Sequence, residues 1–477
     1  MSLRFWLPVV QNPESKQAMS EDYPVDSKSS EALPMREEET RRLNPATVPS
    51  QQHEPPVPLT LEVTSSHRYL KPSESPQAFY TLISVRHPER HSEESPADRT
   101  PLNLCLLLDR STSMKGDRLH QVKAASKQII DSLLPTDYFS LVAFNDRPEA
   151  VVPSGCGVEP ALTKAMVSTI QAAGGTEILQ GLLAAREQLR KGHAQGRLDH
   201  LVLLTDGHTY GDERPCLNLA RWAGSKAIGI TTIGIGADWN ERFLDQLAVI
   251  SGGTSYYVAD VMDIPRILGA ILMQLRTVTI PSLTLTIEPY PAAHVVEIFQ
   301  VSPVLTHLPI ESLPITVTLG TMTAGEKRAV LVEYHVTSSQ LGQTPIAQVS
   351  ATAQMLSSRN QCQPTRQAID AEFSTAAQTA NTPVPSTIVS AMRRVTLLKL
   401  QEKASADIIS GNINAAQERL DAVATQLLDL GQAELAQVAA NQAAHVAHTQ
   451  ALSTEASKQL HYGTRALSPF DSKEGGQ

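Results

Sequence analysis

Five residues with oxygen-bearing side chains are spaced so that they could bind a single metal ion. In chain order they are Asp109, Ser111, Ser113, Thr176 and Asp206. Asp109 and Asp206 each end an apolar run, which is typical of a buried parallel strand that delivers a carboxylate to the edge of a sheet. Ligands of an open α/β sheet bind outside the carboxyl ends of its strands. We therefore expect the five side chains to converge at that edge.

The donors in this set are hydroxyl and carboxylate oxygens, with no His or Cys among them. Hard oxygen ligands select Mg²⁺, Mn²⁺ or Ca²⁺ over zinc. Mg²⁺ also keeps several of its waters, so one coordination position would be open to an outside acceptor. A carboxylate from an Asp or Glu of a partner protein is the natural candidate for that position.

The elements that would position this site alternate between apolar strands and amphipathic helices over residues 100–278. This pattern predicts an α/β unit with a parallel sheet. Its expected strands cover residues 102–109, 138–144, 200–205, 228–235 and 254–258, and its last helix covers 263–277. That helix leads directly into a strand near Ile280, so any shift of the helix would pull on the strands that follow.

Alternation with a period of two appears on both sides of the α/β unit and predicts half-buried strands. We interpret residues 58–99 as the first strands of a β-sandwich that continues over 279–375, with the α/β unit inserted between them. The alternative is that 58–99 pairs only with the edge of the α/β sheet.

The two ends of the chain differ from this core. Residues 1–57 are rich in Pro, Ser, Glu and Gln and are expected to form a disordered tail. Residues 386–456 are expected to form an α-helical hairpin or bundle, with helices near 387–410, 413–430 and 432–455, and 457–477 a flexible tail.

Three segments together carry a resemblance to a known family. The Asp109–Ser113 segment, the Gly174–Thr176 loop and the Thr205–Gly207 segment resemble, in this order, the metal-ion-dependent adhesion site of a von Willebrand factor type A (vWA) domain. Met114 and Gly116 also fit the family's motif. The resemblance covers about 180 residues and implies a Rossmann-like, doubly wound, mostly parallel sheet.

The resemblance also implies roles for the five residues. Ser111 and Ser113 would be direct ligands, whereas Thr176, Asp109 and Asp206 would bind the ion directly or through water. Arg110 and Glu177 depart from what is usual beside this motif, without removing a ligand. The flanking regions resemble those of bacterial vWA proteins named calcium-activated chloride-channel homologues.

Composition narrows the class of protein. The 477 residues are 41% hydrophobic and 19% charged, and the net charge is −9, which argues against a nucleic-acid-binding protein. The first residues lack the apolar core of a signal peptide, and we find no run of about 20 apolar residues that would span a membrane. None of the four cysteines forms a CxxC pair. A cytoplasmic location is the expectation.

These observations favour a non-catalytic, metal-dependent protein-binding module that acts as an adaptor, a scaffold or a regulatory component of a multiprotein complex. The alternatives are a regulatory subunit of an AAA+ ATPase, an exported adhesin or channel regulator, and a haloacid-dehalogenase-like phosphatase. The phosphatase is disfavoured because such a site needs an acid/base Asp where this chain has Ser111. A further possibility is that the acidic tail around Glu37 occupies the site in cis.

Overall fold

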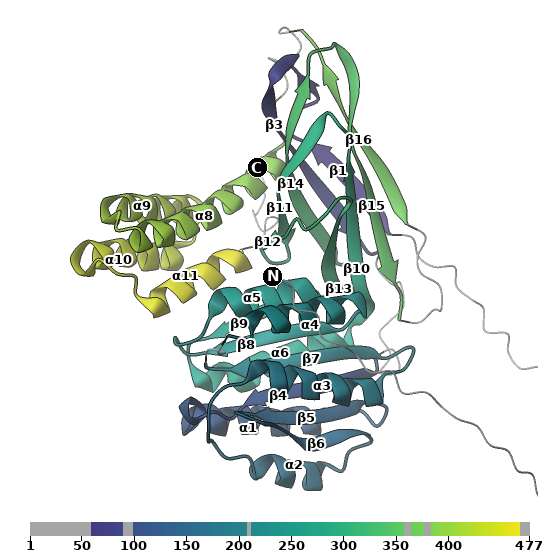
Figure 1. Cartoon of the computed structure of the whole chain (residues 1–477), viewed down its shortest axis with the longest axis vertical. Coiled ribbons are helices and arrows are strands. Elements are labelled where there is room, and N and C mark those ends of the chain that lie inside the picture. The colour runs from purple at the N-terminus through teal and green to yellow at the C-terminus, as the bar shows by residue number, and fades with distance from the viewer. Residues whose placement is uncertain (1–58, 89–98, 208–210, 357–363, 376–382, 468–477) are drawn as a thin grey trace, which may run out of the picture. The chain divides into compact units, whose positions relative to one another are not determined.

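The computed structural model describes residues 59–88, 99–207, 211–356, 364–375 and 383–467. Figure 1 shows three parts in this region: an α/β part, a part built from long strands, and a group of helices near the C-terminal end of the chain. The expected tail 1–57, including Glu37, lies outside the described residues.

The α/β part is built on a six-stranded sheet with the order β6-β5-β4-β7-β8-β9. All neighbouring strands run parallel except β5 and β6, which are antiparallel. The antiparallel edge strand β6 was not expected from the sequence. The strands are β4 (Leu102–Asp109), β5 (Tyr138–Phe144), β6 (Pro148–Cys156), β7 (Leu198–Thr205), β8 (Gly229–Ile235) and β9 (Ser255–Val258).

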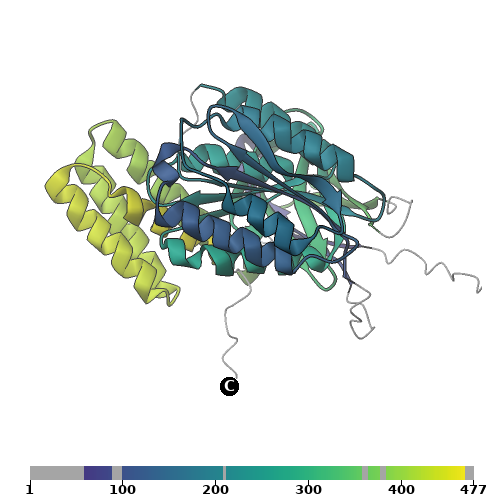
Figure 2. The same ribbon diagram turned by 90° about the horizontal axis from the view of Figure 1, so that it is seen from below.

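Helices cover both faces of this sheet, as Figure 2 shows. Successive side chains of β4 point to opposite faces, so Leu104 and Leu106 pack into one apolar cluster and Cys105 and Leu107 into the other. The first cluster includes side chains of α1 and α6, and the second includes side chains of α3, α4 and α5. The helices are α1 (Asp117–Asp131), α2 (Pro160–Ser168), α3 (Ile178–Gly192), α4 (Glu213–Ser225), α5 (Glu241–Ser251) and α6 (Ile264–Arg276).

The strand-rich part consists of two five-stranded sheets, with the orders β1-β3-β14-β11-β12 and β13-β10-β15-β16-β2, which share one apolar core. Strand β3 pairs with β14, and β2 pairs with β16, so residues before and after the α/β part belong to the same sheets. The strands are β1 (Thr60–Ser65), β2 (Tyr69–Leu70), β3 (Ser73–Arg86), β10 (Val278–Pro289), β11 (Ala293–Ser302), β12 (Thr306–Leu308), β13 (Ile315–Thr323), β14 (Lys327–Ser338), β15 (Gly342–Gln354) and β16 (Thr365–Phe373).

The connection from α6 to β10 is short and anchored. Arg276, the last residue of α6, forms a buried ion pair with Asp137, with 2.7 Å between Nη1 and Oδ1. The same Oδ1 accepts a hydrogen bond from the backbone N–H of Leu102 at the start of β4. A movement of α6 along its axis would therefore have to break a buried charge pair, which opposes the helix shift considered above.

The C-terminal region contains four helices: α8 (Ser386–Ile409), α9 (Ile413–Asp429), α10 (Ala433–Thr449) and α11 (Thr454–Ala466). The first three correspond to the expected helices, except that α10 ends at Thr449 and not near residue 455. The expectation of a flexible tail from 457 is wrong over most of α11, which packs in the same apolar cluster as α8, α9 and α10 through Leu460. No helix in the described ranges is long and apolar enough to cross a membrane.

Helix α11 is held in place by polar contacts with the α/β part. The ammonium of Lys458 donates hydrogen bonds to the backbone carbonyls of Ala237 and Trp239, at 2.6 and 2.8 Å, and lies 3.9 Å from the centre of the Trp239 ring. These contacts form only when α11 reaches a loop more than two hundred residues earlier in the chain, so the local sequence around 457 does not reveal them.

A second group of contacts on α11 surrounds the carboxylate of Asp245 on α5. Arg465 donates to it at 2.6 Å and Tyr462 at 2.8 Å, and His461 Nε2 lies 2.9 Å away. Arg465 also donates to the backbone carbonyl of Leu305, at 3.0 Å, between β11 and β12. This buried charge cluster therefore joins α11 to both the α/β part and the strand-rich part.

Candidate metal centre

The carboxyl ends of two neighbouring parallel strands bring together the two acidic residues of the expected site. Asp109 is the last residue of β4, and Asp206 directly follows β7. The chain leaves β4 towards β5 on one side and later returns to β7 on the other, so the strand order reverses between β4 and β7. Crevices at such switch points are where open α/β sheets bind ligands.

Hydrogen bonds connect four of the five expected residues to one another. Asp109 accepts from the Ser111 backbone N–H at 2.7 Å. The hydroxyls of Ser111 and Ser113 are 3.0 Å apart, and the Ser113 hydroxyl donates to Asp206 Oδ1 at 2.7 Å. Asp109, Ser111 and Asp206 are buried, while Ser113 is exposed, so the cluster opens to solvent beside Ser113.

The fifth expected residue, Thr176, lies at the same edge, on the loop before α3. A β-carbon placed on Gly207 would lie 3.1 Å from the Thr176 hydroxyl and 3.8 Å from Asp109 Oδ2. The bare backbone of Gly207 thus lets the Thr176 loop approach the two strand ends. The backbone carbonyl of Gly174, which has φ +81°, accepts from the Thr112 N–H at 3.1 Å and so fixes this loop against the Asp109–Ser113 segment.

The two carboxylates have different charge partners. Asp206 Oδ2 accepts from Arg118 at 2.5 Å. Asp109 belongs to none of the ion pairs found among the described residues, and its Oδ2 accepts only from the neutral Thr205 hydroxyl, at 2.6 Å. Burial raises the pKa of Asp109 to about 6, against the lowering effect of its bonds to Thr205 and Ser111. The site therefore holds a carboxylate whose negative charge lacks a counter-charge.

These donors fit a hard divalent cation. They are hydroxyls and carboxylates gathered around one opening, and the unbalanced charge at Asp109 favours a positive ion. In the described part of the chain, no group of three or more His, Cys, Asp or Glu side chains could hold a metal ion. Any metal bound here would consequently depend on Ser111, Ser113 and Thr176 in addition to the two carboxylates.

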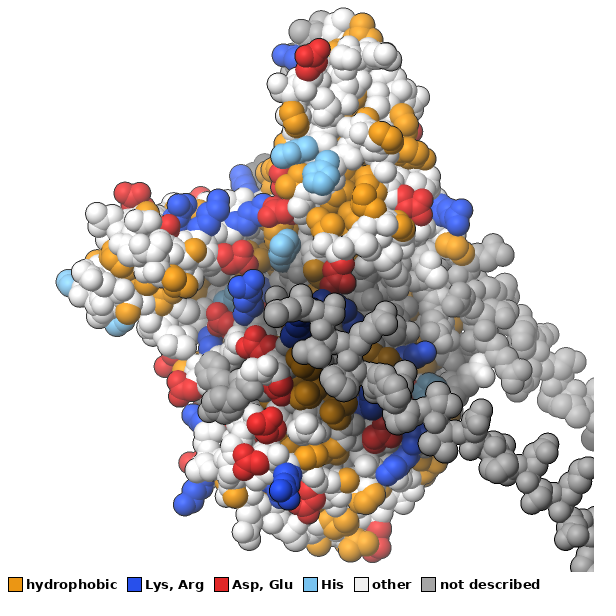
Figure 3. Space-filling model, in the orientation of Figure 1, with side chains coloured by type: hydrophobic (Ala, Val, Ile, Leu, Met, Phe, Trp, Pro, Cys, Tyr) orange, Lys and Arg blue, Asp and Glu red, His pale blue; other side chains and the backbone are white. Residues whose placement is uncertain are grey.

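Two polar side chains at this site were not singled out from the sequence. Thr205 stands in the Thr205–Gly207 segment, but only the structure shows its hydroxyl donating to Asp109. Arg118, the second residue of α1, shows no sequence signal that relates it to Asp206, because the two are 88 positions apart. Figure 3 shows acidic and basic side chains interspersed over the visible face of the α/β part, rather than a field of one sign.

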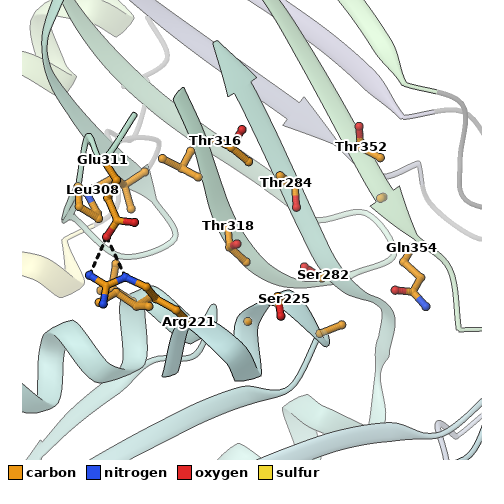
Figure 4. A pocket seen from close by; sticks show the side chains of 17 residues that line it. Arg221, Ser225, Ser282, Thr284, Leu308, Glu311, Thr316, Thr318, Thr352 and Gln354 are labelled. Atoms are coloured by element: carbon orange, nitrogen blue, oxygen red, sulfur yellow. Dashed lines mark hydrogen bonds and ion pairs between the residues drawn. The ribbon is translucent and has the colours of Figure 1, made fainter. Parts of the chain in front are cut away.

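A separate cleft of about 450 Å³ lies away from these oxygens, between the end of α4 and the strands β10, β13 and β15. Figure 4 shows Ser and Thr hydroxyls along its strand wall, including Thr284, Thr318 and Thr352. Its charged residues, Arg221 and Glu311, form an exposed ion pair at 2.8 Å and so compensate each other. This cleft does not contain the unbalanced charge that distinguishes the metal centre.

Sequence comparisons relate two parts of the chain to known families. Residues 103–270 match the model of the von Willebrand factor type A domain, and residues 386–469 match the Sll0103-like, C-terminal alpha-helical domain. The protein sll0103 of Synechocystis is 31% identical over 257 residues, which are 53% of this chain and 61% of that protein. Human inter-alpha-trypsin inhibitor heavy chain H4 is 32% identical over 215 residues, 42% of this chain and 22% of its own. The chain thus spans less than two thirds of these relatives.

Solved structures extend the likeness in fold to most of the chain. A von Willebrand factor type A protein from Catenulispora acidiphila superposes with a TM-score of 0.69 at 17% identity, over 86% of this chain and 97% of that one. The ArnB paralog VWA2 from Sulfolobus acidocaldarius gives a TM-score of 0.55 at 13% identity, over 86% and 99%. The α/β part of this chain therefore has a fold like that of von Willebrand factor type A domains, and it is followed by an α-helical region that matches the Sll0103-like C-terminal domain.

Proposed function

We propose that this chain is a non-catalytic protein-binding module that holds a divalent cation, Mg²⁺ in the first instance, and docks a carboxylate of a partner protein on it. The observation that carries the proposal is the convergence of five oxygen-bearing side chains, one of which, Asp109, is a buried carboxylate without a counter-charge. A hard cation supplies that charge and accepts hydroxyl ligands.

Each residue has a distinct part in this arrangement. Ser111 and Ser113 present neutral hydroxyls towards the opening and would contact the ion directly. Asp109 and Asp206 supply the negative charge, and Thr176 adds a hydroxyl from the opposite loop. The bound cation would act as a Lewis acid that attracts an external carboxylate. Since three of the five donors are neutral, the ion would keep much of its positive charge for the partner.

The side chains near the site are poorly suited to acid/base catalysis, so the proposed module is non-catalytic. Both oxygens of Asp109 already accept hydrogen bonds, from Ser111 and Thr205, which leaves this carboxylate poorly placed to take a proton from a substrate. The residue two positions after Asp109 is Ser111, whose hydroxyl does not titrate near neutral pH. A general acid/base pair of the phosphatase type is therefore missing from the Asp109–Ser113 segment.

The test is metal-dependent capture of partners. Wild-type protein with Mg²⁺ should retain partner proteins that are released by EDTA, and the double variant Asp109→Ala/Ser111→Ala should retain none of them. A matched control replaces the same residue types elsewhere in the domain, Asp131→Ala/Ser132→Ala, at the end of α1. Asp131 pairs with Lys164 on α2 and lies outside the oxygen cluster, so the control should bind as wild type does. Capture that survives both EDTA and the double variant would refute the proposal.

The identity of the captured protein distinguishes the settings in which such a module works. An AAA+ ATPase whose activity rises on mixing would identify the chain as a regulatory subunit of that machine. A cytoplasmic complex without an ATPase would fit an adaptor or scaffold. A cell-surface partner would instead fit an exported adhesin or channel regulator.

A further inference from the structure

Arg118 forms an ion pair with one of the two carboxylates of the metal centre, and no part of the proposed function uses it. Its guanidinium donates to Asp206 Oδ2 at 2.5 Å, and Nη1 lies 3.5 Å from the backbone carbonyl of Ser113. The Asp206 side chain is fully buried, whereas about a third of the Arg118 side chain is exposed. The positive charge therefore stands at the mouth of the site and the negative charge at its base.

The position of this guanidinium is built into the fold. Arg118 is in the first turn of α1, and the 3-10 turn Thr112–Met114 and Gly116 connect that helix directly to the Asp109–Ser113 segment. On the other side, a β-carbon at Gly236 would lie 3.0 Å from Arg118 Nη2. Gly236 has φ +73°, a conformation that favours glycine, so the end of β8 leaves room for the guanidinium.

We propose that Arg118 sets the charge balance of the metal centre, so that it lowers the affinity for the cation and raises the affinity for an anionic partner. This inference rests on the proposed function. Two carboxylates and one guanidinium leave the empty centre with an excess of negative charge. A divalent cation reverses the sign and leaves an excess of positive charge, which an external carboxylate then neutralises.

The direction of both effects follows from Coulomb's law. If Arg118 stays on Asp206 when the cation enters, the two positive charges repel each other at short range. If Arg118 leaves Asp206, the cation must break an ion pair to a buried carboxylate. Either way the arginine weakens cation binding. Once the cation is bound, the same positive charge attracts the incoming carboxylate, and it also allows the guanidinium to donate a hydrogen bond to it.

The first measurement uses Mn²⁺ alone, titrated into the full chain and followed by the electron paramagnetic resonance signal of the free ion. Arg118→Gln should bind Mn²⁺ about tenfold more tightly than the wild type, and Arg118→Lys, which keeps the charge, should stay closer to the wild type. Arg110→Gln is the matched control, because Arg110 adjoins the motif but its side chain pairs with Glu149 on β6 at 2.7 Å. Its effect should remain below about twofold, since that exposed pair is screened by solvent.

The second measurement titrates acetate into the Mn²⁺-loaded proteins and follows water proton relaxation, which falls when a carboxylate displaces a water from Mn²⁺. Arg118→Gln should need about tenfold more acetate than the wild type. The two shifts have opposite signs, which a general loosening of the site would not produce. Mn²⁺ binding that is unchanged or weaker in Arg118→Gln would overturn the inference, and so would unchanged acetate binding.

Failure of the inference is distinguishable from failure of the proposed function by one additional variant. If Asp109→Ala abolishes Mn²⁺ binding while Arg118→Gln has no effect, the metal centre stands and the role of Arg118 is wrong. If wild type and Asp109→Ala bind Mn²⁺ equally, the centre itself is wrong and the inference falls with it.

Discussion

Two carboxylates in the same α/β part, the buried Asp109 and the partly buried Asp245, have opposite electrostatic surroundings. Asp245 accepts from Arg465 and Tyr462 and lies 2.9 Å from His461. Burial by itself would raise the pKa of Asp245, but the charge of Arg465 and the contacts with His461 and Ser255 together hold that pKa well below the usual range. Asp109 accepts from the Ser111 backbone N–H and from neutral hydroxyl groups, and burial raises its pKa to about 6.

The difference distinguishes a structural contact from a binding site. The structural contact, which we call the joint, consists of Asp245 on α5 with His461, Tyr462 and Arg465 on α11. A carboxylate whose charge is fully balanced by its own chain fixes the geometry of the elements that meet around it. A carboxylate left without a counter-charge costs free energy in the empty protein, and that cost is recovered when a cation binds. On this reasoning Asp245 stabilises the docked position of α11, while Asp109 provides a binding position for a cation.

The largest effect is expected at the joint. Arg465→Met removes the positive charge and leaves the partly buried Asp245 without a charged partner of its own, which should destabilise the docking of α11 by about 3 kcal/mol. Hydrogen exchange over residues 454–466 should then approach that of an undocked helix. The double variant Asp245→Asn/Arg465→Met is the control and should be milder, because it leaves no unpaired charge. Equal protection of α11 in wild type and Arg465→Met would contradict this view of the joint.

The second prediction concerns Asp109→Asn. Removing an unbalanced buried charge should leave the thermal stability of the metal-free protein unchanged or slightly higher, while Mn²⁺ affinity should fall by about 100-fold or more. Thermal unfolding with and without Mn²⁺ measures both effects, and Asp131→Asn is the matched control. A large loss of stability in the metal-free variant would show that Asp109 is a structural group like Asp245.

The two carboxylates should also respond differently to pH. The pKa of Asp109 in the folded protein, about 6, exceeds its unfolded value of about 3.9, so its contribution to metal-free stability falls as pH rises from about 4 to 6. Cation binding needs the ionised form, so Mn²⁺ affinity should drop about tenfold between pH 7 and pH 5.

The joint should not change over that pH range. The pKa of Asp245 is depressed, so its stabilising contribution is present above the unfolded value of about 3.9 and is lost only as pH falls below it. Hydrogen exchange of residues 454–466, corrected for the intrinsic effect of pH, should be the same at pH 7 and pH 5. Loss of protection over α11 at pH 5, or unchanged Mn²⁺ affinity, would remove the distinction between the two sites.

The smallest effect is expected for Tyr462→Phe. The Tyr462 hydroxyl donates to Asp245 at 2.8 Å and lies 3.1 Å from the Ser255 hydroxyl, while Arg465 remains on the carboxylate in the variant. The loss should be about 1–2 kcal/mol in the docking of α11. Hydrogen exchange of the same helix measures it, and an effect as large as that of Arg465→Met would mean that the hydroxyl, rather than the charge, dominates the joint.

Local sequence patterns predicted many of the strands and helices of the molecule. Apolar runs that end in Asp109 and Asp206 predict β4 and β7, because strands buried on both faces carry apolar side chains at consecutive positions. The edge strand β6 was missed, since part of it is exposed and its apolar pattern is weak. Helix α11 was missed because Lys458 and Arg465 are charged residues, which are typical of exposed positions, yet both are buried in the fold.

What the sequence determined by itself is the set of donor types and the order of the elements that present them. Periods of two and of three to four residues, and the spacing of Asp109, Ser111 and Ser113, are short-range properties that a local pattern contains. Only the tertiary structure decided the charges around them. Arg118 meets Asp206 across 88 positions and Arg465 meets Asp245 across 220, and such pairs depend on which strand ends and helices the fold brings together. For this reason the sequence could place two carboxylates at one edge, but it could not show which buried carboxylate lacks a counter-charge.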